Sequence, residues 1–110
     1  MNLRPGEIVT ILFPFSKLDK LKQRPVIIIS PIDKFGDFIC LAITSKETHE
    51  QAMRIDDKAI ENGLLPKTSF IRYDKIFTLN SLLVKNRIGS LKNDKYMTLK
   101  KLLCSTMGCS

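Results

Sequence analysis

Apolar residues in this chain fall into short runs of strand length separated by turn-forming residues, and this pattern restricts the fold more than any other feature. The clearest run is "PVIIIS" at 25–30, whose continuous apolar residues predict a strand buried on both faces. Its proline stands at the first position, where a strand tolerates proline. Only residues 93–108 carry the spacing of a long helix. The chain is therefore expected to be mainly β.

The remaining strands are expected on both sides of this run. A Pro5-Gly6 turn precedes "EIVTILF", and Pro14 should end that strand near Phe13. "DDKAIENG" predicts one helical turn, capped by Asp56 or Asp57 and stopped by Gly63. The other predicted strands are "FICLAITS" at 38–45, "AMRI" at 52–55, "TSFIRYDKI" at 68–76 and "LLVKNRIGSL" at 82–91.

The terminal helix should begin at a cap on Asn93 or Asp94 and end at Gly108. Its expected apolar stripe consists of Tyr96, Leu99, Leu102, Leu103 and Met107. Five to seven short strands and one terminal helix predict a small, strongly bent α+β barrel. At 110 residues, positions 1–110 are expected to form a single domain.

Composition excludes several classes of protein. No apolar run approaches the roughly 20 residues of a membrane span, so no membrane partner is expected. The start "MNLRPGEIV" lacks the apolar centre of a signal peptide, which predicts a cytoplasmic protein. Three cysteines and one histidine argue against a disulfide framework or a zinc site, and Cys40 is expected in the core.

Charge is distributed unevenly along the chain, whose formal net charge is +7. Residues 1–25 have a net charge of +3, residues 26–63 of −3 and residues 64–110 of +7. Two basic ends around an acidic middle could form a positive surface for a polyanion. Generic solubility explains the charge equally well.

Polar residues at strand edges are the remaining candidates for chemistry, because no metal-ligand cluster, phosphate loop or nucleophile elbow occurs. They are Arg24, Thr44, Ser45, Arg72 and Asp74. Each also has a purely structural explanation. Arg24 could be a basic loop residue, and Thr44 and Ser45 could simply end a strand. Arg72 and Asp74 could form a surface ion pair. His49, within "KETHEQ", is expected to be an exposed loop residue.

Four segments together resemble the MazF/PemK family of toxin–antitoxin ribonucleases. They are "GEIVTILFPFSKLDKLKQRPVIIIS", "LAITSK", "GLLPKTSFIRYDKI" and "VKNRIGSL", in family order. The resemblance implies an SH3-like barrel with a C-terminal helix. It also implies a homodimeric endoribonuclease that needs no metal or other cofactor and takes single-stranded RNA. A cognate antitoxin with an acidic, flexible tail would neutralise it, and DNA would be contacted only through that antitoxin.

The resemblance also implies roles for individual residues. Arg24 matches the active-site arginine of the Arg-Pro step, and Thr44 matches its usual partner. Arg72 and Asp74 match an Arg-x-Asp pair of some PemK-type members. The remaining candidates would bind substrate: Ser45, Ser69, Lys20, Lys22 and Phe15.

Two departures from the family keep other functions open. The first loop, "SKLDKLKQ", lacks the histidine of some members, and a frequent tryptophan near the first strand is missing. One alternative is an inactive barrel that binds RNA or regulates its own operon with an antitoxin. The other is a protein-binding toxin of the related CcdB type, which traps gyrase and needs no clamp for phosphate charge.

Overall fold

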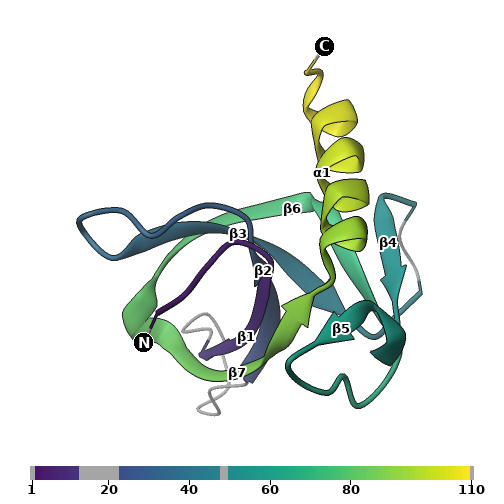
Figure 1. The fold of residues 1–110 in the computed structure, drawn as a ribbon. Coiled ribbons are helices and arrows are strands. Elements are labelled where there is room, and N and C mark those ends of the chain that lie inside the picture. The colour runs from purple at the N-terminus through teal and green to yellow at the C-terminus, as the bar shows by residue number, and fades with distance from the viewer. Residues whose placement is uncertain (1, 13–22, 48–49, 110) are drawn as a thin grey trace.

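The computed structural model describes residues 2–12, 23–47 and 50–109. They form one curled sheet of seven antiparallel strands and one long helix, α1 (Figure 1). The sheet order is β4-β6-β3-β2-β1-β7-β5. The strands are β1 (Glu7–Leu12), β2 (Gln23–Ile28), β3 (Asp37–Thr44), β4 (Ala52–Ile55), β5 (Ile60–Glu61), β6 (Ser69–Asn80) and β7 (Val84–Leu91). The prediction of a bent, mainly β fold is confirmed.

The first strand, β1, lies between a strand from the N-terminal part of the chain and the last strand of the sheet. β1 pairs with β2 on one side and with β7 on the other. Gly6, at φ +94°, turns the chain into β1, and its N–H donates to the carbonyl of Ile28 at 2.7 Å. Its carbonyl accepts the N–H of Leu91 at 2.8 Å. The predicted Pro5-Gly6 turn therefore connects the start of β1 to the ends of β2 and β7.

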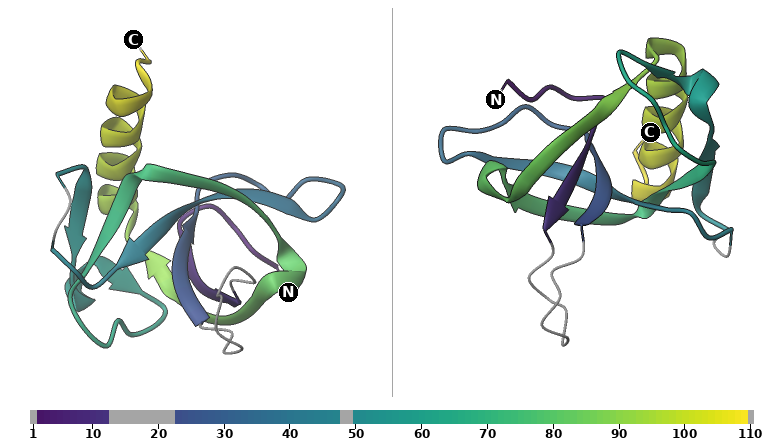
Figure 2. Two further views of the ribbon diagram at one scale, coloured as in Figure 1. Left: turned by 180° about the vertical axis from the view of Figure 1, so that it is seen from behind. Right: turned by 90° about the horizontal axis from the view of Figure 1, so that it is seen from below.

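Each face of the sheet carries an apolar core. Ile27 belongs to a helix-side core, whereas its neighbours Val26 and Ile28 belong to a core on the opposite face. Residues 26–28 are thus buried on both faces, as predicted for the run at 25–30, whereas Pro25, Ile29 and Ser30 are half-buried. The helix-side core also contains Ile8, Leu41, Ile43, Ile55, Ile71, Leu91 and Leu99, and the opposite core contains Leu3, Val9, Ile11, Phe38, Cys40 and Leu79. Figure 2 shows α1 standing on one side of the curl.

Several strand boundaries differ from the prediction, and Leu82 and Leu83 belong to a 3-10 turn, Ser81–Leu83, rather than to β7. β2 begins at Gln23, so Pro25 is its third residue rather than its first. The β2–β3 ladder begins only at Val26, so Pro25 lies on a part of β2 that β3 does not pair. β6 continues to Asn80 because residues 76–80 pair with the first half of β3.

The segment before β5 is a short 3-10 turn, Asp57–Ala59. Asp56 caps it as predicted, by accepting the N–H of Lys58 at 3.0 Å. Gly63 does not stop this turn, because the turn ends at Ala59 and β5 follows directly. Gly63 instead crosses β7 so closely that an added Cβ would lie 1.9 Å from the carbonyl oxygen of Ile88. The expected role of Gly63 was therefore wrong.

The helix α1 (Asn93–Met107) differs from its prediction at the start. Lys92 is the N-cap and makes no side-chain capping bond, so neither Asn93 nor Asp94 is the cap. Leu99 is the fully buried member of the predicted stripe, whereas Met107 is 63% exposed. The helix ends at Gly108 as predicted, with φ +80°. Among the described residues, no helix is both long and apolar enough to cross a bilayer.

One pair of cysteines is joined, contrary to the expectation from their odd number. The N–H of Cys109 donates to the carbonyl of Cys104 at 2.9 Å, in the turn that closes α1 at Gly108. This capping geometry brings the two side chains together, and they form a disulfide. Cys40 is a free core residue, as predicted. Burial raises the pKa of its thiol to about 12, so thiolate is negligible at neutral pH.

Candidate active site

Three adjacent strands present the predicted catalytic residues on one face of the sheet. β3 pairs with β6 so that Thr44 lies opposite Phe70 and Ala42 lies opposite Arg72. The β2–β3 ladder ends at the pair Val26–Ala42. Arg24 and Thr44 each lie two residues beyond that pair, and side chains two apart in a strand share a face. Arg24, Thr44 and Arg72 therefore face the same way, on the face opposite α1.

An irregularity in β6 shapes this region. Leu41 pairs with Ile76, but the next residue of β3, Ala42, pairs with Arg72. Residues 73–75 are therefore extra on β6 and form a bulge, a feature that re-aims side chains next to active sites. Asp74 stands within this bulge. The alternating pattern of "TSFIRYDKI" predicted the strand but carried no signal for the bulge.

Arg72 and Asp74 form a two-point ion pair. Nε of Arg72 donates to Oδ1 of Asp74 at 3.2 Å, and Nη2 donates to Oδ2 at 2.8 Å. The two side chains are only 19% and 26% exposed. Its two parallel hydrogen bonds and its partial burial make this ion pair stronger than an ordinary surface pair. The structure therefore brings the predicted Arg-x-Asp residues together beside the face that holds Thr44.

The hydroxyl residues differ in accessibility. Oγ1 of Thr44 accepts the N–H of Lys46 at 3.2 Å, and Ser45 follows directly as an exposed residue. Ser69 is buried, and its hydroxyl donates to the carbonyl of Lys67 at 3.1 Å. Because it alternates with Phe70, Ser69 faces the helix side of the sheet. The structure thus separates Ser69 from Arg24, Thr44 and Arg72.

Several predicted residues lie outside the described parts of the chain. They are Phe15, Lys20 and Lys22 in the segment 13–22, and His49 in the segment 48–49. Their expected roles stay predictions. Within residues 2–12, 23–47 and 50–109, no group of three or more His, Cys, Asp or Glu side chains is placed to hold a metal ion.

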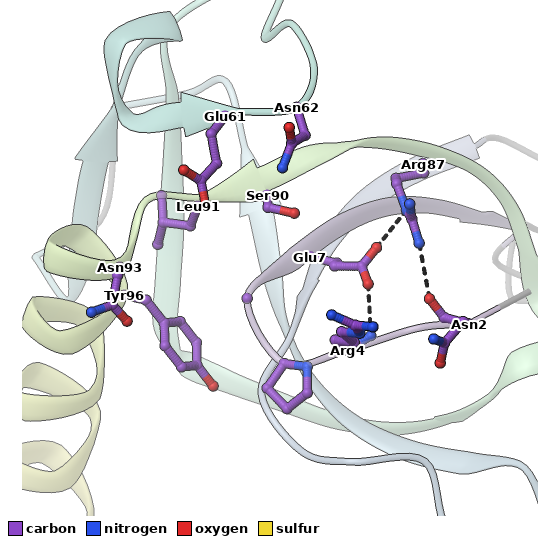
Figure 3. Close-up of a pocket in the computed structure, with 12 residues that line it drawn as sticks. Asn2, Arg4, Glu7, Glu61, Asn62, Arg87, Ser90, Leu91, Asn93 and Tyr96 are labelled. Atoms are coloured by element: carbon purple, nitrogen blue, oxygen red, sulfur yellow. Dashed lines mark hydrogen bonds and ion pairs between the residues drawn. The ribbon is translucent and has the colours of Figure 1, made fainter.

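A cavity of about 570 Å³ lies away from these residues, between the N-terminal segment, β7 and the start of α1 (Figure 3). Its buried charged group is Glu7, whose carboxylate contacts Nε of Arg87 and accepts the N–H of Arg4 at 2.8 Å. Arg87 also donates to the carbonyl of Asn2 at 2.9 Å. These contacts fasten the N-terminal segment to β7, so we assign Glu7 and Arg87 a structural role.

Sequence reasoning missed this pair, although one signal was present. Glu7 is a carboxylate at the start of an otherwise apolar strand, and such a buried charge requires a partner. The partner could not be read from the sequence because Arg87 lies 80 positions further along the chain. Tyr96 also lines the cavity, and burial raises the pKa of its phenol above the usual value.

The fold is shared with several solved toxin structures. A MazE–MazF structure from Deinococcus radiodurans has a TM-score of 0.79 and 16% identity, with 100% of each chain covered. An endoribonuclease with its cognate antitoxin from a Mycobacterial species has a TM-score of 0.72 and 14% identity, covering 96% of this chain and 95% of that one. Mycobacterium tuberculosis toxin MazF-mt6 has a TM-score of 0.67 and 17% identity, covering 93% and 98%. These similarities define the protein as a MazF-type barrel.

The sequence itself gives the family. Residues 4–107 match the profile of the PemK-like, MazF-like toxins of type II toxin–antitoxin systems. No curated protein sequence matches the chain. Because the family profile spans nearly the whole chain, the protein belongs to the PemK/MazF-like toxin family.

Proposed function

We propose that the protein is a sequence-selective endoribonuclease toxin that cuts single-stranded mRNA and so inhibits translation and growth. The main support is that Arg24, Thr44 and Arg72 share one face of three adjacent strands, with Asp74 paired to Arg72. This arrangement supplies cationic donors, a hydroxyl and a carboxylate within one region. Family membership and the endoribonuclease description of a structural neighbour support the same reaction.

RNA brings its own nucleophile to such a site. Attack by the ribose 2′-OH on the adjacent phosphorus breaks the bond to the 5′ oxygen, and the products are a 2′,3′-cyclic phosphate and a 5′-OH. The protein need only align the attack, accept the 2′-OH proton and stabilise the charge that develops on the phosphorane, while the departing 5′ oxygen takes its proton from water. None of these tasks requires a metal ion or another cofactor.

Each residue has a role that fits its chemistry. The guanidinium of Arg24 would donate two hydrogen bonds to non-bridging phosphate oxygens, and Thr44 would add a neutral hydroxyl donor. Asp74 would accept the 2′-OH proton as a general base. Arg72 donates one hydrogen bond to each oxygen of the Asp74 carboxylate and so fixes its orientation. Arg72 is thus a positioning residue for Asp74 that can also face phosphate.

The test is RNA cleavage in excess EDTA. Purified protein incubated with a mixed-sequence RNA should give discrete cuts whose rate magnesium alters only through ionic screening. Loss of cleavage in EDTA that one particular divalent ion restores would overturn the metal-independent mechanism. Uncut RNA with a retarded band would indicate an RNA-binding barrel instead, and uncut RNA without binding would return the CcdB-type alternative.

We further propose that the toxin is a homodimer. Large apolar side chains are exposed at one end of the sheet, where Phe35 is 72% and Leu82 is 89% exposed. The N–H of Ser81 donates to the carbonyl of Gly36 at 2.8 Å, which holds these two side chains in the same region. Sedimentation at micromolar concentration should show twice the chain mass of 12.5 kDa. A single species at the chain mass would refute the dimer.

The proposed regulator is a cognate antitoxin with an acidic, flexible tail, and DNA would be bound only through that antitoxin. The net charge of +7 favours an acidic partner. Two of the structural neighbours were solved as complexes with an antitoxin or with MazE. Addition of the cognate antitoxin should suppress RNA cleavage at equal molar amounts, and undiminished cleavage would contradict this assignment.

A further inference from the structure

Arg54, on the short edge strand β4, shares the face of the proposed active site. β4 pairs with β6 so that Arg54 lies opposite Phe70, and β3 pairs with β6 so that Thr44 lies opposite the same Phe70. Partners in an antiparallel ladder carry their side chains on the same face. Thr44, Phe70 and Arg54 therefore form one row across three neighbouring strands. The sequence pattern of a four-residue strand gave no indication of this row.

The neighbouring row continues the basic character of this face. Ala52 on β4 and Ala42 on β3 lie on either side of Arg72. These two alanines are small, and Phe70 is the apolar side chain that stands next to both Arg72 and Arg54 on this face. Arg24, Arg72 and Arg54 thus stand on one face of four adjacent strands. Such a stripe of cations follows a polyanion better than one isolated arginine does.

Arg54 is available for a ligand. Its side chain is 62% exposed, and Nη1 lies 3.7 Å from Oδ2 of Asp56, which is itself 40% exposed. An exposed pair at this distance is held weakly. A phosphate oxygen offers the guanidinium the same charge and the same acceptor geometry as the carboxylate does. Arg54 can therefore leave Asp56 and bind a phosphate with little loss of free energy.

We propose that Arg54 binds a backbone phosphate of the RNA next to the scissile one. Neighbouring strands are about 4.8 Å apart, so the backbones of Thr44 and Arg54 are roughly 10 Å apart across β6. This separation suits a phosphate beside the cleaved linkage rather than the cleaved phosphate itself. The inference rests on the proposed ribonuclease function, and it makes Arg54 a substrate-binding residue with no part in proton transfer.

The distinguishing experiment separates binding from chemistry. Arg54→Ala should raise KM for RNA roughly fivefold to tenfold while kcat stays within about twofold of wild type. The dependence of binding on salt should become shallower by about 0.7 in the log–log slope, the value for one phosphate contact on a single strand. The loss should be equal for RNAs of different sequence, because phosphate contacts carry no sequence information.

Two further variants sharpen the test. Lys101→Ala removes the same charge from an exposed position on α1, on the other side of the sheet, and should leave KM unchanged. Asp56→Asn keeps a side chain that can cap the 3-10 turn but releases Arg54 from its ion pair, so KM should fall. The decrease should vanish when Arg54→Ala is added.

The possible results distinguish failure of the role of Arg54 from failure of the ribonuclease function. If wild-type protein cuts RNA and Arg54→Ala cuts it with unchanged KM and unchanged salt slope, the role of Arg54 is refuted while the ribonuclease function stands. A fall in kcat at constant KM would also refute a binding role. If wild-type protein does not cut RNA at all, the proposed function itself fails.

Discussion

Arg24→Lys is expected to slow RNA cleavage by on the order of 100-fold or more while changing RNA affinity by less than roughly tenfold. Lysine keeps the positive charge but loses the planar pair of donors that matches two phosphate oxygens. The affinity changes little because one phosphate contact is a small share of the total. Single-turnover cleavage and equilibrium binding, measured on the same RNA, would separate the two effects. Cells should tolerate this variant.

The matched control is Arg4→Lys, the same exchange at a position that lines the separate cavity by Glu7. It should leave both cleavage and binding unchanged, because the structural contact of Arg4 is made by its backbone N–H. Wild-type cleavage by Arg24→Lys would show that Arg24 contributes only general attraction, and the proposed clamp on the phosphorane would be withdrawn.

Gly63→Ala should lower the free energy of unfolding by roughly 3 kcal/mol or more, a range reached when buried atoms are forced together. The new Cβ would lie 1.9 Å from the carbonyl oxygen of Ile88 and 2.6 Å from Cα of Gly89. Both neighbours are backbone atoms, so no change of rotamer relieves the overlap. The segment after β5 would have to move away from β7. Urea unfolding, followed by circular dichroism, would measure the loss.

Gly108→Ala provides the comparison for this steric effect. Gly108 has φ +80° and no atom within 4 Å of an added Cβ, so alanine there meets only backbone strain. That strain is worth about 1–2 kcal/mol. If Gly63→Ala lowers the free energy of unfolding no more than Gly108→Ala does, that result would contradict the close approach of residue 63 to β7.

The strands were predictable wherever a local pattern was enough to specify them. The continuous apolar residues at 25–30 predicted burial on both faces, and β2 supplies residues to both cores. The end of β6 was missed although "IFTL" at 76–79 contains strand-forming residues, and pairing with β3 extends the strand to Asn80. The role of Gly63 could not be predicted from local sequence, because the atoms that exclude a side chain there belong to β7.

The candidate site was predictable in part. The resemblance supplied Arg24 and Thr44, but it also supplied Ser69, which alternation along "TSFIRYDKI" places on the face opposite Arg72. Which strands are neighbours, however, depends on the order of the sheet. The sequence of β4 therefore could not show that Arg54 stands beside Phe70, and the ladder between β4 and β6 was needed to find it.

The pairing of β1 with β7 has a consequence for synthesis of the protein on the ribosome. Of the described strands β1 is translated first, yet one of its two partners, β7 at residues 84–91, is translated last. Until then the edge of β1 stays open, and its N-terminal segment lacks the anchor that Arg87 provides. A nascent chain therefore cannot complete this sheet until residues 84–91 have been translated. The face that carries Arg24, Thr44 and Arg72 thus becomes part of a complete sheet only after all seven described strands have been translated.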